Sequence, residues 1–514
     1  MTTAQQAGPG EEVDPGIDVP ARIAEVMAID PAAPAIWYGD QVWTWEDCCR
    51  FGEQLMGLLG VPPSEADGLQ LAAVMRNRPG AVSTLLRSLV DRCCLVPISA
   101  IQPPSGVAAD LERLAPAAVV ADAEDVTSEL VGAAEAIGCA VVRSRGRELE
   151  VAVAGRAGEA ARRPGVAVWM PTSGTTGPPK RLPITYRDLS LGFARVRRYS
   201  KSNEQAASAA TLSTGVVVSA TPLVHILGLW NVMQFAVEGR RLVLLDRFDA
   251  GPWSEAVAAH RPVVASLPPA ALVMLLEAGV APEKLSSLRA VMCSTAALAP
   301  EVERAFTERF GVPVLTTYGA TEFPGGLSGW TLEDKRAFGA AKWGSVGRPR
   351  PGIQVRVVDP DGGAEVPQGT EGQIEVMSAQ TVARGEAGWV RTTDLGRLDE
   401  DGFLWISGRA DGAINRGGFK VLPEAVEAVL AEHPAVRAVG VVGLPDDRLG
   451  QVPVAAVELR SPASEDELVQ WARARLAKYQ VPVRVHVVDA LPKTPSLKVS
   501  RAELARVLSE GAGA

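Results

Sequence analysis

The feature that most constrains the fold is the alternation of short apolar, β-type runs with Ala-, Leu- and Arg-rich stretches through the first three quarters of the chain. The apolar runs have the length of buried strands, and the stretches between them are typical of helices. The expected strands lie at residues 71–75, 118–121, 166–170, 241–245, 263–267 and 312–316. Such alternation favours helices layered on largely parallel sheets, so we predict an α/β fold.

The pattern changes after Gly344. Expected strands at 355–359 and 373–376 flank the turn sequence P-D-G-G at 360–363, and a further short strand is expected at 403–407. A glycine-rich turn between two apolar runs is typical of a hairpin. We therefore predict a β-rich subdomain here.

The composition restarts beyond the polar segment 408–412. The remaining stretch, about 100 residues long, has the usual size of a small domain. Its expected helix, 423–432, begins with Pro423, which is favourable in a first turn, and carries one apolar face. We place a domain boundary at 408–412 and expect a compact α+β unit after it.

Composition and charge exclude several functions. The formal net charge of the 514 residues is −9, which does not suggest the basic surface that nucleic acids require. Residues 1–20 contain acidic residues but no Lys, Arg or apolar run, so we expect a disordered tail rather than a signal peptide or anchor. No later stretch approaches about 18 uninterrupted apolar residues, so we expect no membrane span and a cytoplasmic location.

Cysteine and histidine are few. Two adjacent cysteine pairs in a long chain do not resemble a disulfide framework, and no C-x-x-C unit occurs, so we expect free and mostly buried thiols. None of the four histidines lies in a metal-binding motif, which argues against a transition metal held by the protein.

The strongest local signal is the segment T-S-G-T-T-G-P-P-K at 172–180. It follows an apolar strand and precedes an expected helix at 186–199, and Lys180 is the first lysine of the chain. Glycines let backbone amides approach phosphate oxygens, hydroxyl groups add donors, and the lysine adds charge. We predict a phosphate site formed by Thr172, Ser173, Gly174, Thr175, Thr176 and Lys180.

This loop resembles the phosphate loop of the adenylate-forming superfamily, which includes acyl-CoA synthetases, aryl-CoA ligases, carrier-protein adenylation domains and luciferases. Further motifs follow in the family's order between about Ile36 and Arg501. The resemblance implies a ligase of acyl-CoA-synthetase type that activates a carboxylic acid with ATP and Mg²⁺ and passes it to coenzyme A. It also implies a large domain of two layered α/β subdomains and the β-rich subdomain (21–409), a hinge (410–412) and a small mobile domain (413–514).

The segment T-Y-G-A-T-E at 317–322 resembles the family's nucleotide motif. There, Thr317, Tyr318, Gly319 and Ala320 would line the adenine and ribose. By the same resemblance, Thr321 would meet the α-phosphate and Glu322 would bind Mg²⁺. One carboxylate beside phosphates is sufficient for Mg²⁺, which prefers few protein ligands.

Asp394 and Arg409 resemble the family's ribose-binding residues, and Asp411 resembles its hinge residue. A carboxylate suits a vicinal diol because it offers two acceptor oxygens. Lys498 resembles the catalytic lysine that bridges the substrate carboxylate and the α-phosphate, and Lys493 is the competing candidate. A cation is needed there because two anions must approach each other.

Two further segments resemble the thiol and acyl sites. The glycine segment with Gly417, Gly418, Phe419 and Lys420 would lie along the coenzyme A tunnel, where a side chain would block a narrow channel. The family resemblance assigns the acyl pocket to His225, Ser294, Thr295 and Ala296. His225 would either position the thiol or line the acid site.

The sequence departs from the family pattern at three places. Leu497 and Thr393 replace glycines that usually precede the catalytic lysine and the ribose aspartate, and residues 293–296 lack the usual glycines. These changes leave open a second function: an enzyme that only joins a preformed acyl-AMP, supplied by a partner, to coenzyme A.

A third function is a stand-alone adenylation enzyme that loads a separate carrier protein. A non-catalytic nucleotide sensor or scaffold is disfavoured because Lys180, Glu322, Asp394, Arg409 and Lys498 are all present. The stretch 222–228 offers no carboxylate for an amino group, so a hydrophobic or aromatic acid fits better than an amino acid. A homodimer is compatible with the sequence.

Overall fold

The computed structural model describes residues 16–155, 161–171, 181–199, 209–319, 326–360, 362–378, 388–416, 419–446, 448–494 and 498–511. The chain packs as two compact units. The first comprises Met1–Met170, Leu182–Val217 and Gly228–Leu244, and the second comprises Pro171–Arg181, Val218–Leu227 and Leu245–Ala514.

The first unit is built on a seven-stranded sheet with the order β7-β6-β5-β3-β4-β8-β9. Its strands are β3 (Gln70–Met75), β4 (Cys94–Ser99), β5 (Ala118–Asp122), β6 (Ala140–Arg145), β7 (Glu148–Val153), β8 (Val166–Pro171) and β9 (Arg181–Thr185). Strands β6, β5, β3, β4 and β8 are parallel, and β7 is antiparallel. Every residue of β3 is buried, as expected for a parallel strand covered on both faces.

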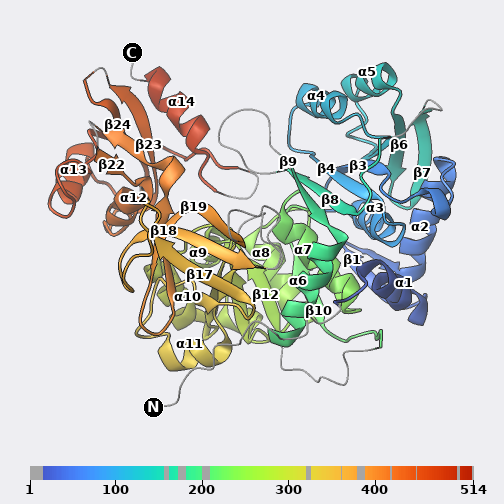
Figure 1. Cartoon of the computed structure of the whole chain (residues 1–514), viewed down its shortest axis with the longest axis horizontal. Helices are drawn as coiled ribbons and strands as arrows, with labels where there is room; N and C mark the ends of the chain where they lie inside the picture. The colour runs from blue at the N-terminus through green and yellow to red at the C-terminus, as the bar shows by residue number, and fades with distance from the viewer. Residues whose placement is uncertain are drawn as a thin grey trace. The chain divides into compact units, whose positions relative to one another are not determined.

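Helices cover both faces of this sheet (Figure 1). On one face, α4 (Pro104–Leu114) and α5 (Ser128–Ile137) bury Leu111 and Leu130 in a cluster with Val96 of the sheet. On the other face lie α1 (Val19–Ile29), α2 (Trp45–Leu58) and α3 (Pro79–Val90). The loops after the neighbouring strands β3 and β4 therefore lead to opposite faces, which makes a crevice at their carboxyl ends.

A four-stranded sheet has the order β10-β11-β1-β2. Its strands are β1 (Pro34–Tyr38), β2 (Gln41–Thr44), β10 (Val216–Ser219) and β11 (Arg241–Leu244). The nearby helices are α6 (Tyr186–Tyr199) and α7 (Ile226–Val237). Trp45 stacks on Phe235 with ring centroids 5.1 Å apart, so α2 and α7 share an aromatic core.

The second unit begins with a five-stranded sheet, in the order β12-β13-β14-β15-β16. Its strands are β12 (Val264–Leu267), β13 (Ala290–Cys293), β14 (Val314–Tyr318), β15 (Ser328–Gly329) and β16 (Arg348–Pro349). The helices of this part are α8 (Ala250–His260), α9 (Pro269–Glu277), α10 (Pro300–Phe310) and α11 (Leu332–Phe338). Because β12, β13 and β14 are parallel, their carboxyl ends meet at one edge.

An antiparallel sheet follows, with the order β17-β18-β19-β20. Its strands are β17 (Ile353–Val358), β18 (Gly372–Ser378), β19 (Trp389–Leu398) and β20 (Leu404–Arg409). Strands β17 and β18 pair from Ile353–Ser378 to Val358–Gln373, so the expected β-rich hairpin is confirmed. The short 3₁₀ helix Ala410–Gly412 comes directly after β20, at the expected boundary.

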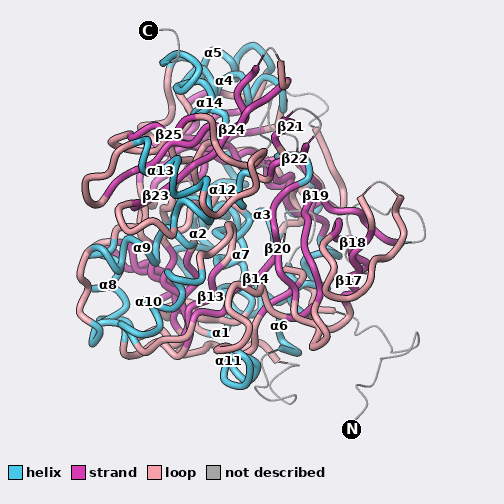
Figure 2. The backbone as a smooth tube through the Cα atoms, turned by 90° about the vertical axis from the view of Figure 1, so that its left-hand side faces the viewer, coloured by secondary structure: helices cyan, strands magenta, loops and turns pink. Residues whose placement is uncertain are grey.

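The last part is a small α+β body whose sheet has the order β22-β21-β24-β23, with β25 paired to β24 (Figure 2). Its elements are β21 (Ile414–Arg416), β22 (Phe419–Val421), α12 (Pro423–Ala431), β23 (Val436–Asp446), β24 (Gly450–Leu459), α13 (Glu465–Arg473), β25 (Arg484–Val487) and α14 (Arg501–Gly511). Helices α12 and α13 pack on one apolar cluster and α14 packs on another. The sheet is therefore covered on two faces.

The predicted α/β fold with a β-rich part and a small α+β part is confirmed, and each predicted strand is present within two residues of its expected ends. The expected tail through Pro20 is wrong at its end. Helix α1 starts at Val19 because Asp18 accepts a hydrogen bond from the Ala21 N–H, and Ile17 and Val19 are buried. Residues 1–15 lie outside the residues that the structure describes.

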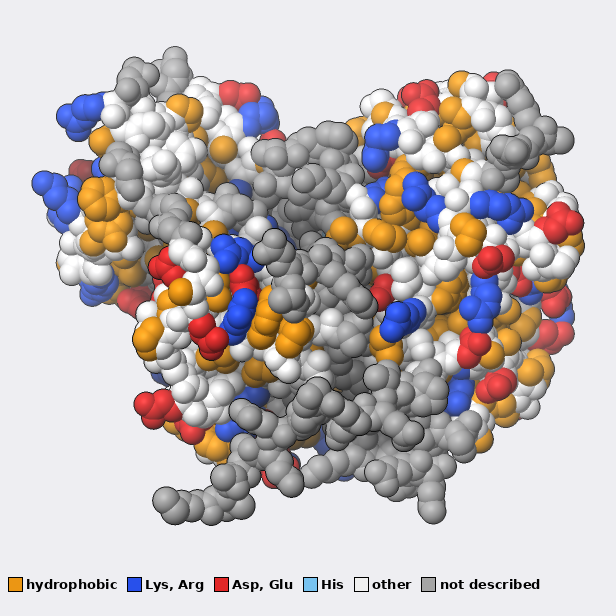
Figure 3. Space-filling model, in the orientation of Figure 1, with side chains coloured by type: hydrophobic (Ala, Val, Ile, Leu, Met, Phe, Trp, Pro, Cys, Tyr) orange, Lys and Arg blue, Asp and Glu red, His pale blue; other side chains and the backbone are white. Residues whose placement is uncertain are grey.

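All six cysteines are free, and five are buried, which confirms the expectation for them. Acidic and basic side chains are interspersed over the visible face of the described residues (Figure 3). Within the described part of the chain, no helix has the length and apolar character needed to cross a membrane.

Candidate active site

Three predicted nucleotide-binding residues meet in the second unit because of where their strands end. Tyr318 is the last residue of β14, and Asp394 of β19 lies opposite Arg409, the last residue of β20. The Tyr318 hydroxyl donates a hydrogen bond to Asp394 Oδ2 at 2.5 Å. Burial, and then the Asp394 charge, raise the pKa of Tyr318, so the phenol stays a donor. The geometry confirms that these three residues are neighbours.

Glycine is required where backbones approach closely at this edge. A Cβ on Gly319 would lie 2.8 Å from the Gly326 Cα, and the Leu327 N–H donates to the Tyr318 carbonyl. A Cβ on Gly396 would lie 2.1 Å from the Trp405 carbonyl oxygen. These contacts fix the end of β14 and the bulge in β19, and thus the directions of Tyr318 and Asp394.

Lys498 belongs to a small hairpin before α14. Its backbone N–H donates to Thr494 Oγ1 at 3.2 Å, and its carbonyl accepts from the Thr494 N–H at 2.7 Å. An antiparallel bridge joins Lys493 to Val499. Because residues of a hairpin alternate in direction, the two lysines have different surroundings. The Lys493 side chain is 43% exposed, whereas Lys498 is half-buried.

Lys498 interacts electrostatically with Arg409 and with His225, although the three residues are distant in the sequence. Burial, and then the positive charge of Arg409, lower the pKa of Lys498. Within the described ranges, no carboxylate forms an ion pair with Lys498. Two cations brought together in this way make a site that favours an anion.

His225 is held just before α7, where its N–H donates to the Pro222 carbonyl. Burial, and then the charge of Lys498, lower its pKa to about 4, so the imidazole is neutral at pH 7. Its buried Nε2 has no hydrogen-bond partner among the described residues. Buried polar atoms are rarely left unpaired, so this atom is a candidate for substrate contact.

The predicted acyl-pocket residues lie after the carboxyl end of β13. Ser294 and Thr295 are half-buried, whereas Ala296 is exposed. Thr295 has φ +78°, a left-handed conformation that is costly for a β-branched residue and normally suits glycine. Its buried Oγ1 has no partner among the described residues. Thr295 is therefore strained at a position where a glycine would not be.

The departure at Thr393 has a different outcome. Thr393 is exposed, while its neighbour Asp394 is turned inward towards Tyr318. Successive side chains of a strand point to opposite faces, so the extra side chain does not enter the site. Thr393 is thus compatible with a working nucleotide site.

Several predicted residues fall outside the described residues. They are Thr172, Ser173, Gly174, Thr175, Thr176, Lys180, Ala320, Thr321, Glu322, Gly417, Gly418 and Leu497. The backbones of Asp411 and Lys420 are described but their side chains are not. Phe419 is exposed and stacks on Tyr479 with centroids 4.9 Å apart, and Thr317 lies opposite Gly329 in the β14–β15 pair.

Sequence reasoning missed Thr392. Its hydroxyl accepts from the Asp394 N–H at 3.1 Å and donates to the Ile374 carbonyl at 2.9 Å, so it fixes the aspartate from β18. The only signal was its position two residues before Asp394. A pair of threonines beside an aspartate is too common to identify this role.

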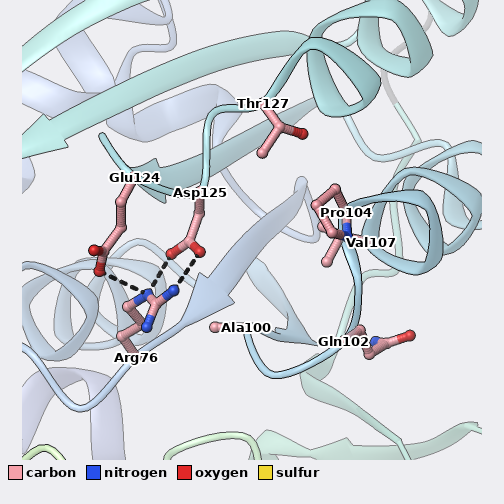
Figure 4. A pocket seen from close by; sticks show the side chains of 8 residues that line it. All are labelled: Arg76, Ala100, Gln102, Pro104, Val107, Glu124, Asp125 and Thr127. Atoms are coloured by element: carbon pink, nitrogen blue, oxygen red, sulfur yellow. Dashed lines mark hydrogen bonds and ion pairs between the residues drawn. The ribbon is translucent and has the colours of Figure 1, made fainter.

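A hollow of about 200 Å³ in the first unit was also not predicted (Figure 4). It lies at the carboxyl ends of β3, β4 and β5, where Arg76 donates two 2.7 Å hydrogen bonds to Asp125 and contacts Glu124. Gln102 and Thr127 line it as well. Its charges are largely paired with one another, so the hollow offers few free charges to a ligand.

The parallel sheets, the Tyr318–Asp394 pair at a strand end and the small C-terminal body together define an α/β protein with a separate α+β part. A family profile described as "AMP-binding enzyme" matches residues 24–385, and "AMP-binding enzyme C-terminal domain" matches residues 425–498. The chain belongs to the AMP-binding enzymes of the adenylate-forming acyl-CoA synthetase superfamily.

Curated relatives include 4-coumarate–CoA ligase-like 9 of Oryza sativa subsp. japonica, which is 35% identical over 356 residues, 65% of this chain and 62% of that protein. A 2-succinylbenzoate–CoA ligase of Bacillus cereus is 32% identical over 351 residues, 66% of this chain and 69% of that protein. The aligned part thus spans somewhat under two thirds of the first relative.

Solved structures match over nearly the whole chain. O-succinylbenzoate coenzyme A synthetase from Bacillus subtilis, solved with AMP, has a TM-score of 0.75 at 26% identity and covers 94% of this chain and 97% of its own. ATP-bound MatB from Rhodopseudomonas palustris has a TM-score of 0.80 at 23% identity, covering 96% and 99%. The second match shows a shared fold.

Proposed function

We propose that the chain is an acid–thiol ligase. It activates a hydrophobic or aromatic carboxylic acid as acyl-AMP with ATP and Mg²⁺ and transfers the acyl group to coenzyme A. The proposal is supported by relatives that are named CoA ligases and by a neighbour solved with ATP and magnesium ion. It makes the boundary at residues 410–412 a hinge between two working arrangements of the enzyme.

The observation that carries the proposal is the electrostatic interaction of half-buried Lys498 with Arg409 and with His225. Lys498 is half-buried next to another cation, and burial and Arg409 lower its pKa. A half-buried ammonium beside a second cation attracts an anion. The α-phosphate of ATP and the carboxylate of the acid together supply that anion.

In the first half-reaction, a carboxylate oxygen of the acid attacks the α-phosphorus, and the bond from phosphorus to pyrophosphate breaks. Lys498 reduces the repulsion between the two anions and stabilises the charge that develops on the phosphoryl oxygens. Asp394 and Tyr318 hold the ribose, for which the aspartate supplies acceptor oxygens and the phenol fixes its direction.

In the second half-reaction, the thiol proton passes to water, the sulfur attacks the acyl carbon, and the bond from that carbon to the AMP oxygen breaks, so that AMP leaves. His225 is neutral at pH 7 and has an unpaired Nε2, so it can hydrogen-bond the acid or the thiol without adding charge. A neutral lining favours an uncharged acyl group, and the stretch 222–228 offers no carboxylate to the ammonium group of an amino acid.

A panel of acids tests the proposal. The protein is incubated with ATP, Mg²⁺ and 4-coumarate, 2-succinylbenzoate, anthranilate or phenylalanine, with and without coenzyme A, and pyrophosphate and thioester are measured separately. We expect acid-dependent pyrophosphate with at least one aromatic acid, and thioester only when coenzyme A is added. If none of the acids, nor a wider set, yields either product, the proposed function is wrong.

A matched pair of variants identifies the working lysine. Lys498→Met should lower acid-dependent pyrophosphate release by about 100-fold or more, because a positioned charge acts on the transition state. Lys493→Met removes the exposed lysine of the same hairpin and should have a much smaller effect. Synthetic acyl-AMP given with coenzyme A distinguishes a complete ligase from an enzyme that performs only thiol transfer.

A further inference from the structure

An ion pair joins the small C-terminal body to a helix of the preceding part, and both residues belong to the second compact unit. Arg437 of β23 donates to both carboxylate oxygens of Glu277, the last residue of α9, at 2.8 and 2.6 Å. Two parallel hydrogen bonds between a guanidinium and a carboxylate fix direction as well as distance. The pair therefore defines how β23 lies on α9.

Glu277 has no favourable role within its own helix. It ends α9, where the helix dipole favours a cation rather than a carboxylate. Its pKa is lowered chiefly by the hydrogen bond from Arg437, with further contributions from the charges of Arg460 and Lys493. All three cations belong to the C-terminal body, so the carboxylate interacts with that body rather than with its own helix.

Further charged residues connect Arg437 to the hairpin that carries Lys498. Glu458 of β24 is buried and lies 3.7 Å from Arg437, and its Oε1 accepts the Leu491 N–H at 2.8 Å. The same carboxylate lies 3.9 Å from the Lys493 ammonium. Glu458 thus links the residue that contacts α9 to the start of the lysine hairpin.

We propose that the Arg437–Glu277 pair positions Lys498 for the first half-reaction by docking the C-terminal body on α9. The pair acts through Lys498, so Arg437 and Glu277 are positioning residues rather than catalytic ones. The proposal rests on the proposed ligase function. A hinge rotation that carries the C-terminal body away from α9 breaks the pair, so the second half-reaction does not need it.

The test measures the two half-reactions separately in the full-length protein. Acid-dependent ATP–pyrophosphate exchange, with the best acid of the panel, reports the first, and thioester formation from the matching synthetic acyl-AMP and coenzyme A reports the second. Arg437→Gln and Glu277→Gln should each lower the exchange kcat about two- to fivefold, the range that a partly exposed ion pair supports. Conversion of acyl-AMP should stay unchanged.

Charge reversal sharpens the test. Arg437→Glu should lower exchange more than Arg437→Gln, because the new carboxylate faces both Glu277 and the buried Glu458. The double variant Arg437→Glu/Glu277→Arg should recover only part of the loss, because Glu458, Arg460 and Lys493 then face like charges. About 1 M salt should reduce the difference between wild type and Arg437→Gln, since the Debye length then falls to about 3 Å. A pair that only stabilised the fold would lower both half-reactions together, so the selective loss of exchange is the result that indicates positioning.

Glu255→Gln is the matched control, because Glu255 forms a similarly exposed pair with Lys284 at 2.6 Å, away from the C-terminal body. It should leave both half-reactions unchanged. The positioning role is refuted if Arg437→Glu exchanges pyrophosphate like wild type or if both half-reactions fall together. Wild-type protein that catalyses neither half-reaction overturns the proposed function and, with it, this inference.

Discussion

Acidification should destabilise this protein through His225. Its pKa falls from 6.5 to about 4 on folding, because burial and the nearby Lys498 charge disfavour the imidazolium. Above pH 6.5 the histidine is neutral in both states and has no effect. Between pH 6.5 and 4, His225 binds a proton in the unfolded chain but stays neutral in the folded protein. The free energy of unfolding therefore falls as the pH falls.

The magnitude follows from the shift. At about 1.4 kcal/mol for each unit, the full penalty is roughly 3 kcal/mol near pH 4, and about 2 kcal/mol of it is present at pH 5. The variant His225→Gln does not titrate. It should therefore lose about 2 kcal/mol less free energy of unfolding than wild type between pH 7 and pH 5.

Urea unfolding at the two pH values measures this difference, and the control His486→Gln removes a half-exposed histidine of β25. NMR titration of the four histidine rings supplies the pKa of His225 directly. If His225→Gln loses as much stability as wild type on acidification, or if the ring titrates near 6.5, the reasoning from burial is wrong.

Three further predictions concern the site. The pKa of Lys498 is lowered, so pyrophosphate exchange should decline with rising pH, and this decline should begin below the ordinary lysine pKa of 10.5. Arginine stays charged over this range, so Lys498→Arg should remove the decline from a profile of kcat/KM against pH. Tyr318→Phe should raise the KM for ATP about 10-fold, since a hydrogen bond to a charged group contributes about 1.5–3 kcal/mol. Gly408→Ala should lower the free energy of unfolding by about 1–3 kcal/mol in urea titrations, because Gly408 has φ +152° and its Cβ would lie 2.7 Å from Glu424 Oε2.

The elements of the fold could be read from the sequence because each depends on local pattern. Apolar runs such as residues 71–75 gave strands, and helix α6 has the predicted bounds. The beginning of α1 was missed because Asp18 and Pro20 are as common in disordered tails as at the start of a helix. The burial of Val19, which the sequence does not show, identifies them as helix-start residues. The two compact units were not foreseen either, since residues 171–181 and 218–227 join the second unit although their neighbours belong to the first.

The site shows the same limit. Motifs identified Tyr318, Asp394, Arg409 and Lys498. The first three are neighbours in the structure, and the charge of Arg409 contributes to lowering the pKa of Lys498. Their energetic relations depend on burial and register, which the sequence does not contain. The Arg437–Glu277 pair joins residues 160 positions apart and belongs to no motif, so no sequence pattern could have indicated it.

The burial of the thiols has a practical consequence for observing the enzyme at work. Burial raises the pKa of Cys48, Cys93 and Cys139 to about 12, and Cys49 is the one cysteine that is not classed as buried. Thiolate is the form that reacts with maleimides, so a protein with Cys49 replaced should take up such reagents slowly at neutral pH. Fluorophores or spin labels could then be attached at cysteines introduced on either side of residues 410–412, and the proposed domain motion could be tested during turnover.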